Sequence, residues 1–582
     1  MRQPDSSPAT EQEQAEFFDQ LCEGFREAAA RTGEIVRDFR VAGTSVRLRF
    51  AGQALMSSIV PGLANAVSEL EAGPRCEVCL WDSESTGAPL APQPRPAKDF
   101  TERGNIWGFD SPRCRSAYQW GESSVNVMDR ATGRAVYWVP SPKHVPAWVL
   151  AAPLRSILHW WMELNGRQLV HAAAVGHRGH GVLIPGRGGS GKSSTSLACL
   201  LDGFDFLGDD YVALALDPQP RIYRLYSTAK LDPRTLTQYP ELQKRCHTVY
   251  QPGFDKVVLF LEDHYREQLR ESLPLELVLK PRFSGSPETT LGPVKPLEIE
   301  RALASETLVH LPHAGMRTLE FLSRVSHQVP RAAIHLGTDR ARIPAAIPAA
   351  LEGEASVDAS GRPPSDPKPF VSVIAHLWEE DREELRTLAE AIEAQGYPRT
   401  EFLVILDGRA CSMAGEKATL PDNVRFLSFN DPVVSAEAWN RGIRESFADL
   451  LLFLEPGDRL QPGALESLVN ACERVPEASW IQGRVLCEGL ESPSPSSLRG
   501  ALIRKSAFRE CGLFHTEPFF QSREHIKWIQ QANVKGLSGS AIDSLTLRVA
   551  RPAAMKPGPP ILKPDLGFLK GELARRRKKK PE

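Results

Sequence analysis

The sequence predicts a multidomain α/β protein, and three observations support this fold class. The chain has 582 residues, which is too long for one hydrophobic core and suits three or four domains of ordinary size. A glycine-rich loop at residues 186–193 stands between an apolar strand and a helix. After residue 370, strands and helices alternate again, which is typical of a parallel sheet.

Composition and charge are those of an ordinary globular protein. Hydrophobic residues make up 42% of the chain and charged residues 24%, so each domain has enough apolar material for a core. The formal net charge of -2 gives no general attraction to nucleic acid, and no nucleic-acid partner is expected. The most apolar helix candidate, residues 147–164, contains Arg155, His159 and Glu163. We therefore interpret it as a buried helix and not as a membrane span.

Two further features bear on the compartment. The N-terminus is polar and acidic and has no hydrophobic core of a signal peptide. The ten cysteines show no paired spacing, and the Cys76-x-x-Cys79 motif has no second pair and no nearby histidines. We interpret these two cysteines as reduced thiols and expect a cytoplasmic protein.

Residues 1–140 are predicted to form an N-terminal α+β domain. A polar lead is followed by a helix near residues 16–32, and the run Val46-Arg47-Leu48-Arg49-Phe50 alternates as a half-buried strand does. Strand-like segments lie at residues 40–41, 45–50, 77–81 and 124–128. No catalytic constellation stands out here, so we interpret the domain as a scaffold or as a recognition module for a protein substrate.

The loop at residues 186–193 reads G-x-x-x-x-G-K-S, the pattern of a phosphate-binding P-loop. An apolar strand at residues 181–185 precedes it, and a helix at 194–201 follows. Its glycines let successive N–H groups point at phosphate oxygens, and the helix N-terminus adds positive charge. Lys192 is expected at the β- and γ-phosphates and the Ser193 hydroxyl at Mg²⁺. The residues predicted to bind ATP are Gly186, Arg187, Gly188, Gly189, Ser190, Gly191, Lys192, Ser193 and Ser194.

Two consecutive aspartates, Asp209 and Asp210, follow an apolar strand behind the loop. One carboxylate can hold Mg²⁺, and the other can accept the proton of an attacking hydroxyl. Successive side chains of a strand point to opposite faces, so a turn must begin at Asp209 for both to serve. The alternative interpretation is a hydrated turn without a ligand.

A predicted strand at residues 169–175 carries His171 close to the phosphate site. Together, His171, the P-loop and the pair Asp209–Asp210 resemble the catalytic core of HPr kinase/phosphorylase over about residues 168–231. The resemblance is most specific to stand-alone HPr-kinase-like proteins of bacterial peptide-modification and polysaccharide gene neighbourhoods. It implies that the paired aspartates bind Mg²⁺ and act as base toward a hydroxyl, and that His171 lies by the phosphates. The implied acceptor is a peptide, a protein or a glycan-related molecule.

Residues 351–369 are rich in Gly, Pro, Ser and Asp and are predicted to be a linker. The next domain, residues 370–555, is predicted to have a parallel sheet. Strands are expected at residues 370–374, 401–406 and 450–454, with a helix near 382–395. Asp407 follows one of these strands, at the sheet edge where such folds bind ligands.

This second series resembles the family 2 glycosyltransferases of the A-type nucleotide-sugar fold, over about residues 370–550. The resemblance implies that the opening strand and Asp407 bind the uracil and ribose of a nucleotide-sugar, with the helix that contains Asn440 following. It also implies Mn²⁺ or Mg²⁺ beneath the diphosphate. The family's D-x-D-D motif is replaced here by Glu455-Pro456-Gly457-Asp458, and Glu524 stands in the acceptor-base region. An active transferase and a binding-only domain both stay open.

The chain ends in a basic tail, residues 556–582, with six consecutive basic residues at 575–580. Such a run is usually a solvated tail, and weak contact with an anionic membrane or with RNA is the alternative.

The sequence therefore predicts an N-terminal α+β domain (1–140), an HPr-kinase-like P-loop domain (141–350) and a glycosyltransferase-like domain (370–555). The predicted activity is transfer of the γ-phosphate of ATP to a hydroxyl. Two alternatives remain: a nucleotide-sugar-dependent glycosyltransferase with a regulatory P-loop domain, and a non-catalytic nucleotide-binding assembly module. The oligomeric state is not predicted.

Overall fold

A computed structural model describes most of the chain: residues 8–63, 66–67, 73, 75–90, 93–250, 256–353, 368–421, 423–487, 490–491, 498–516 and 524–549. It is a multidomain α/β structure with mixed sheets. Two compact units divide at Phe370 and Val371, and each is described by itself. The predicted basic tail and residues 354–367 of the predicted linker lie outside the described residues.

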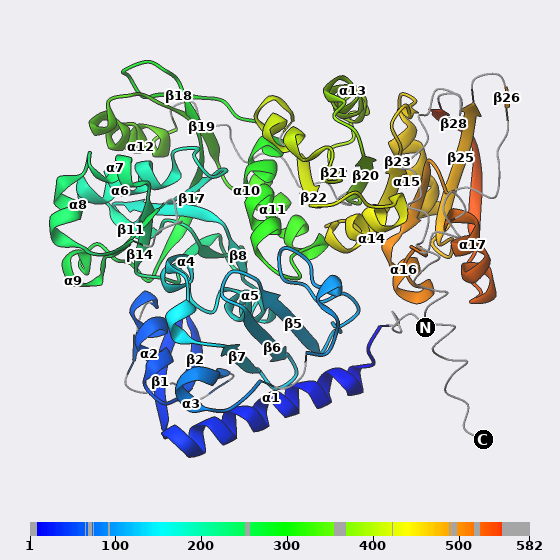
Figure 1. Cartoon of the computed structure of the whole chain (residues 1–582). Helices are drawn as coiled ribbons and strands as arrows, with labels where there is room; N and C mark the ends of the chain where they lie inside the picture. The colour runs from blue at the N-terminus through cyan, green and yellow to red at the C-terminus, as the bar shows by residue number, and fades with distance from the viewer. Residues whose placement is uncertain are drawn as a thin grey trace, which may run out of the picture. The chain divides into compact units, whose positions relative to one another are not determined.

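The first part of the first unit is a seven-stranded sheet in the order β3-β1-β2-β4-β7-β6-β5, with helix α1 along one face (Figure 1). Its elements are α1 (Glu11–Thr32), β1 (Glu34–Val41), β2 (Thr44–Ala51), α2 (Ala54–Ile59), η1 (Val60–Gly62), β3 (Ala66–Val67), β4 (Arg75–Asp82), α3 (Ser83–Thr86), η2 (Ala97–Asp99), β5 (Cys114–Gln119), β6 (Ser124–Asp129) and β7 (Arg134–Val139). The apolar side of α1, with Phe17, Leu21 and Phe25, is buried against this sheet.

Helix α1 begins at Glu11, earlier than the sequence pattern predicted, because Thr10 caps it. The Glu13 amide donates to Thr10 Oγ1 (3.2 Å), and the Thr10 amide donates to Glu13 Oε2 (2.6 Å). This reciprocal capping box supplies hydrogen-bond acceptors to two backbone N–H groups that otherwise lack them at the start of a helix. Cys76 and Cys79 of β4 are free and buried, and burial raises the pKa of both thiols.

The second part of the first unit holds the glycine-rich loop, residues 186–191, at a nine-stranded sheet, and it also has a three-stranded sheet. Its elements are η3 (Pro142–His144), α4 (Ala147–Ala151), α5 (Arg155–Leu164), β8 (Gln168–Val170), β9 (Ala172–His177), β10 (His180–Pro185), α6 (Lys192–Leu201), β11 (Asp205–Gly208), β12 (Val212–Ala215), β13 (Arg221–Arg224), β14 (Thr228–Leu231), α7 (Pro233–Leu236), α8 (Pro240–Arg245), β15 (His247–Tyr250), β16 (Val257–Phe260), α9 (Glu262–Tyr265), β17 (Ser272–Phe283), β18 (Thr290–Gly292), α10 (Pro296–His310), α11 (Met316–Gln328), β19 (Arg331–Leu336), η4 (Arg340–Arg342) and α12 (Ile343–Leu351).

Helices cover both faces of the nine-stranded sheet. Helices α10 and α11 pack on one face through Leu303 and Leu322, and helices α6 and α12 pack on the other through Cys199 and Ile347. Strand β9 contributes side chains to the hydrophobic cores on both faces of the sheet, because alternate residues of a strand point to opposite faces. A sheet buried on both faces explains the continuous apolar runs in the sequence.

Two predictions for this region were wrong in detail. The single helix expected at residues 147–164 is two helices, α4 and α5, since Pro153 interrupts it and Leu154 takes a left-handed conformation (φ +56°). The single strand expected at residues 169–175 is divided at His171 into β8, which pairs with β12, and β9, which pairs with β10 and β11.

The second unit has one mixed sheet in the order β22-β21-β20-β23-β27-β25-β28-β24, and the first four strands are parallel. Its elements are β20 (Val371–Leu377), α13 (Arg382–Glu393), β21 (Thr400–Leu406), η5 (Cys411–Thr419), β22 (Val424–Ser428), α14 (Ser435–Glu445), β23 (Leu450–Leu454), β24 (Arg459–Leu460), α15 (Ala464–Arg474), β25 (Trp480–Cys487), β26 (Leu490–Glu491), β27 (Ala501–Arg504), α16 (Lys505–Cys511), α17 (Glu524–Val534) and β28 (Gly539–Val549).

The order of the four parallel strands creates a switch point in the second unit. From β20 the chain builds β21 and β22 on one side and then returns to place β23 on the other side of β20. Open α/β sheets bind ligands at the carboxyl ends of the strands at such a point. None of the described helices is both long and apolar enough to cross a lipid bilayer.

Candidate functional site

The P-loop lies between the end of β10 at Pro185 and the start of α6 at Lys192. Two of its glycines, Gly186 and Gly191, have a backbone conformation and close neighbours that disfavour a larger residue. A Cβ on Gly186 would lie 2.5 Å from Ser190 Oγ, and one on Gly191, which has a φ of +99°, would lie 2.4 Å from Leu336 Cδ1. Gly186 also has a positive φ (+152°), so a larger residue at either position would be strained and would have to displace the Ser190 or Leu336 side chain.

The Lys192 ammonium lies inside this loop. Its Nζ donates to the carbonyl oxygens of Gly186 (2.6 Å) and Arg187 (2.9 Å). Burial lowers the pKa of Lys192, although Asp210 opposes that shift. The lysine is therefore positioned at the centre of the loop that would enclose a phosphate.

The sheet register brings the predicted residues to one edge. Pro185, at the end of β10, pairs with Ala172, and Gly208, at the end of β11, pairs with Ala174. His171, Gly186 and Asp209 each adjoin one of these paired ends. The strand β11 ends at Gly208, and both aspartates lie in the bend that follows it.

Asp209 points to the start of α6. Its Oδ1 accepts from Ser196 Oγ (3.2 Å), its Oδ2 accepts from the Lys230 amide (2.8 Å), and its carboxyl also takes a hydrogen bond from the Ser193 side chain. The residue is 2% exposed, and it has no ion-pair partner among the described residues. Burial, followed by the charge of Asp210, raises the pKa of Asp209.

Asp210 lies between two basic side chains. His171 Nε2 is 3.0 Å from Asp210 Oδ1, and Lys230 Nζ forms an ion pair with Oδ2. Burial opposes ionisation of Asp210, but Lys230 and then His171 hold its pKa well below the ordinary value. Burial also lowers the pKa of His171 to about 4, so this imidazole is neutral at neutral pH.

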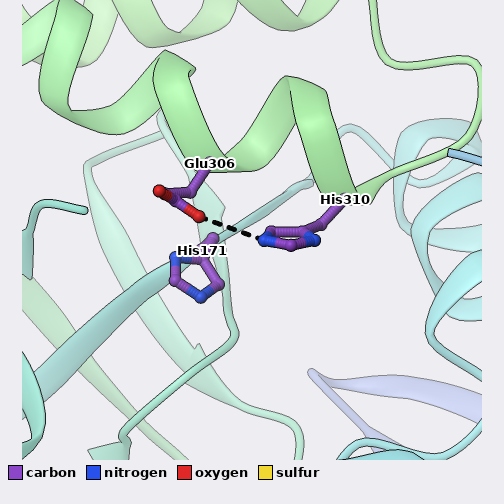
Figure 2. A group of neighbouring side chains, drawn as sticks. All are labelled: His171, Glu306 and His310. Atoms are coloured by element: carbon purple, nitrogen blue, oxygen red, sulfur yellow. Dashed lines mark hydrogen bonds and ion pairs between the residues drawn. The ribbon is translucent and has the colours of Figure 1, made fainter. Parts of the chain in front are cut away.

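Two further residues join this edge from helix α10 (Figure 2). Glu306 and His310 are bonded to each other, with Oε2 and Nε2 3.0 Å apart, and the ring centre of His310 lies 5.4 Å from that of His171. Burial alone would raise the pKa of Glu306, but the hydrogen bond of His310 and neighbouring positive charges, Lys192 among them, lower it to about 2. The only sequence signal for this pair is a spacing of one helical turn, which most surface helices also contain.

The donor set around Asp209 fits a hard cation such as Mg²⁺. The hydroxyl of Ser193 and the carboxylate of Asp209 supply oxygen ligands, which Mg²⁺ prefers. Asp209 is a buried carboxylate without an ion-pair partner among the described residues, so a bound cation would supply the missing positive charge.

In the second unit, Asp407 and Asn440 already have protein partners. The Arg409 amide donates to Asp407 Oδ1 (2.9 Å), and Arg409 Nη2 donates to Oδ2 (2.8 Å). Asn440 exchanges hydrogen bonds with the backbone of Phe514, donating to its oxygen (2.8 Å) and accepting from its amide (2.9 Å). Through these two hydrogen bonds, Asn440 holds helix α14 against the segment that follows α16.

Glu455 and Asp458, which replace the family's metal motif, face an arginine. Arg499 Nη2 lies 2.7 Å from Asp458 Oδ1, Arg499 Nε lies 3.0 Å from both Asp458 oxygens, and Arg499 Nη1 lies 3.1 Å from Glu455 Oε2. Burial raises the pKa of both carboxyls although Arg499 opposes the shift, and Glu524 lies near enough to raise that of Glu455 further. Arg499 occupies the position between the two carboxylates and balances one of their two charges, so a divalent cation would have to displace it.

The sequence contained no sign of this pairing. Arg499 is distant from Glu455 along the chain, and nothing in the pattern around Arg499 indicates that it pairs with an acidic residue. The structure thus brings Glu455, Asp458 and Glu524 close together, whereas the Asn440 side chain is hydrogen-bonded to the backbone of Phe514.

Comparisons with known proteins were made for the whole chain. No family model matches the sequence, and no curated protein matches it. Among solved structures, S. aureus TarS matches at 11% identity and a TM-score of 0.27, over 31% of this chain and 37% of that one. TarS 1-349 in complex with UDP-GlcNAc matches at 12% identity and a TM-score of 0.28, over 33% of this chain and 60% of that one. The chain therefore spans less than two thirds of these structures, and scores at this level do not assign an activity to it.

Proposed function

We propose that the P-loop region of the first unit binds Mg²⁺ and ATP and transfers the γ-phosphate to a hydroxyl of a peptide, protein or glycan-related acceptor. The observation that carries this proposal is the arrangement at one sheet edge. There, Lys192 lies in the loop, Asp209 contacts Ser193, and Asp210 is held by His171 and Lys230. None of the comparisons reported above supports a kinase activity.

The two aspartates have different roles in this proposal. Asp209 and Ser193 would hold Mg²⁺, which neutralises charge on the phosphates when bound. Asp210 is kept ionised by Lys230 and His171, so it can accept a hydrogen bond from the acceptor hydroxyl and then its proton. The oxygen of that hydroxyl forms the new bond to phosphorus as the bond to ADP breaks. Orientation matters more than base strength here, because phosphoryl transfer has a loose transition state.

The seven-stranded part of the first unit contacts the helices that border this site. Arg103 donates to the carbonyl oxygens of Leu308 (3.3 Å) and Ala314 (2.8 Å), and the Asn105 side chain accepts from the His313 amide (3.2 Å). We assign this part the role of a scaffold for α10 and of a surface for acceptor recognition.

A second candidate function belongs to the second unit. Asp407 and Glu455 follow parallel strands at the same edge as the switch point beside β20, where open α/β sheets bind nucleotides. We propose that this unit binds a nucleotide-sugar without a divalent cation, because Arg499 already contacts both Glu455 and Asp458 in the place of a metal. The proposal leaves open whether sugar transfer follows binding.

The kinase proposal is tested with the full chain, radiolabelled ATP and a cell lysate as the acceptor pool. We expect transfer of label in the wild type, and its loss in Lys192→Ala and in Asp210→Asn. Lys244→Ala, which removes an exposed lysine of α8, is the matched control and should behave as the wild type. Binding of ATP without transfer or hydrolysis would favour a nucleotide-gated module, and absence of ATP binding would overturn the proposal.

A further inference from the structure

Three side chains of metal-ligand type meet beside the P-loop: His171 between β8 and β9, and Glu306 and His310 on α10 (Figure 2). One ligand atom from each lies within 4.8 Å of the others. We propose that they form a binding site for a divalent cation of the zinc type, separate from the oxygen site of Ser193 and Asp209. This site does not depend on the proposed kinase activity.

The hydrogen bonds of His171 leave one nitrogen available as a ligand. Nε2 is bonded to Asp210 Oδ1 (3.0 Å), which places a proton on Nε2. The lone pair of a neutral imidazole is then on Nδ1, and this atom is buried without a hydrogen-bond partner. The residue itself is 7% exposed. A histidine that donates one N–H to a carboxylate while its other nitrogen binds a metal is the usual arrangement around zinc.

Glu306 and His310 supply the other two ligands from one face of α10. They are one turn apart, and their Oε2 and Nε2 atoms are 3.0 Å from each other. Ligand atoms on a tetrahedral zinc are about 3.4 Å apart, given bonds of about 2.0–2.2 Å. The ligand atoms of Glu306 and His310 lie up to 4.8 Å from that of His171. A shift of about 1 Å or a little more in the Glu306 and His310 side chains would therefore bring all three to the separation found on zinc. The Glu306 side chain is 24% exposed and that of His310 is 41% exposed.

The chemistry of the three ligands selects the cation. Two imidazoles and one carboxylate form a common set for zinc, whereas Mg²⁺ prefers oxygen ligands and retains its water. Three protein ligands leave a fourth position, and the exposure of His310 places that position toward solvent. A water or an acceptor group could therefore bind there.

The test uses the full chain, stripped of metal with a chelator and kept free of Mg²⁺ and nucleotide. Zinc binding is measured by isothermal titration calorimetry on the wild type, His310→Ala and Glu306→Gln. We expect one site in the wild type, with affinity at least tenfold lower in both variants. His264→Ala removes an exposed histidine of α9 and should bind as the wild type does.

A second measurement places the metal by spectroscopy. In His310→Cys, a thiolate replaces one imidazole, so bound Co²⁺ should gain a sulfur-to-cobalt charge-transfer band that the wild type lacks. The cysteines whose side chains the structure describes are free, and a band already present in the wild type would mean that thiols bind the metal instead. Thermal melting of each apo variant checks that it is folded. Absence of zinc binding by the wild type, or equal binding by folded His310→Ala and Glu306→Gln, would overturn the proposal.

Discussion

Both units place a pair of acidic residues near the carboxyl ends of β-strands, but the two pairs face different partners. In the first unit, Asp209 accepts hydrogen bonds only from hydroxyls and a backbone amide, and it has no ion-pair partner among the described residues. In the second unit, Arg499 contacts both Glu455 and Asp458. In the first unit only Asp210 is paired, with Lys230, and Asp209 has no ion-pair partner among the described residues, whereas in the second unit one arginine contacts both carboxylates.

This difference shows why a motif alone does not predict a metal site. A buried carboxylate whose charge the protein leaves uncompensated either takes up a proton or pairs with a bound cation, so only such a carboxylate is a candidate metal ligand. An arginine that is remote in sequence can compensate the charge, and the local pattern does not reveal it. The following predictions test this contrast, from the largest expected effect to the smallest.

Removing the arginine should have the largest effect. Arg499→Met leaves the buried Asp458 and the partly buried Glu455 without their shared cation, and we expect the second unit to lose about 3–5 kcal/mol of stability. Urea unfolding followed by hydrogen exchange measures the loss in peptides of residues 371–549. Mn²⁺ should restore part of the stability of this variant and none in the wild type. Arg474→Met, at an exposed position of α15, is the control, and an equal loss there would refute the pairing argument.

The pH dependence of the second unit should be nearly as large. Burial lowers the pKa of His376 from its ordinary value of 6.5 to about 4. The unfolded chain therefore binds a proton that the folded unit does not between these values, so stability falls as the pH drops from about 6.5 to about 4. The loss is about 3 kcal/mol at most. His376→Asn should reduce this slope in urea unfolding at several pH values and leave the part that comes from His525, whose pKa burial also lowers to about 4. An unchanged slope would contradict the assignment.

Neutralising Asp209 should affect metal binding and leave folding nearly intact. Asp209→Asn keeps an oxygen acceptor and removes repulsion with Asp210, so stability should change by less than about 1 kcal/mol. The Mg²⁺ concentration needed for ATP binding should rise at least tenfold, because a charged ligand is lost. Ser57→Ala, far from the P-loop in sequence, is a control. Unchanged Mg²⁺ dependence would remove Asp209 from the metal site.

The smallest expected effect concerns nucleotide-sugar binding. If the second unit binds UDP or a UDP-sugar, the affinity should be the same in EDTA and in Mn²⁺, since Arg499 occupies the acidic pair. Calorimetry in the two buffers measures this. A tenfold gain with Mn²⁺ would show that the arginine moves aside for a metal.

Local patterns predicted the parts of the site that are continuous in sequence. The strand, glycine loop and helix around Lys192 lie where the motif placed them, as β10, residues 186–191 and α6. The break of the strand at His171 was missed because an apolar run gives no sign of changing its pairing partner. Glu306 and Arg499 were missed because their roles depend on tertiary contacts, with His171 and Lys192 in one case and with Asp458 in the other. The assignment of ATP, Mg²⁺ and a hydroxyl acceptor stays a prediction.

Equilibrium binding of ATP to the full chain, measured with Mg²⁺ and again with EDTA, tests the central claim most directly. The account predicts binding that requires Mg²⁺ and that Lys192→Ala abolishes, while Arg499→Lys leaves it unchanged. Absence of binding, or binding that is equal in EDTA and in Lys192→Ala, would contradict it.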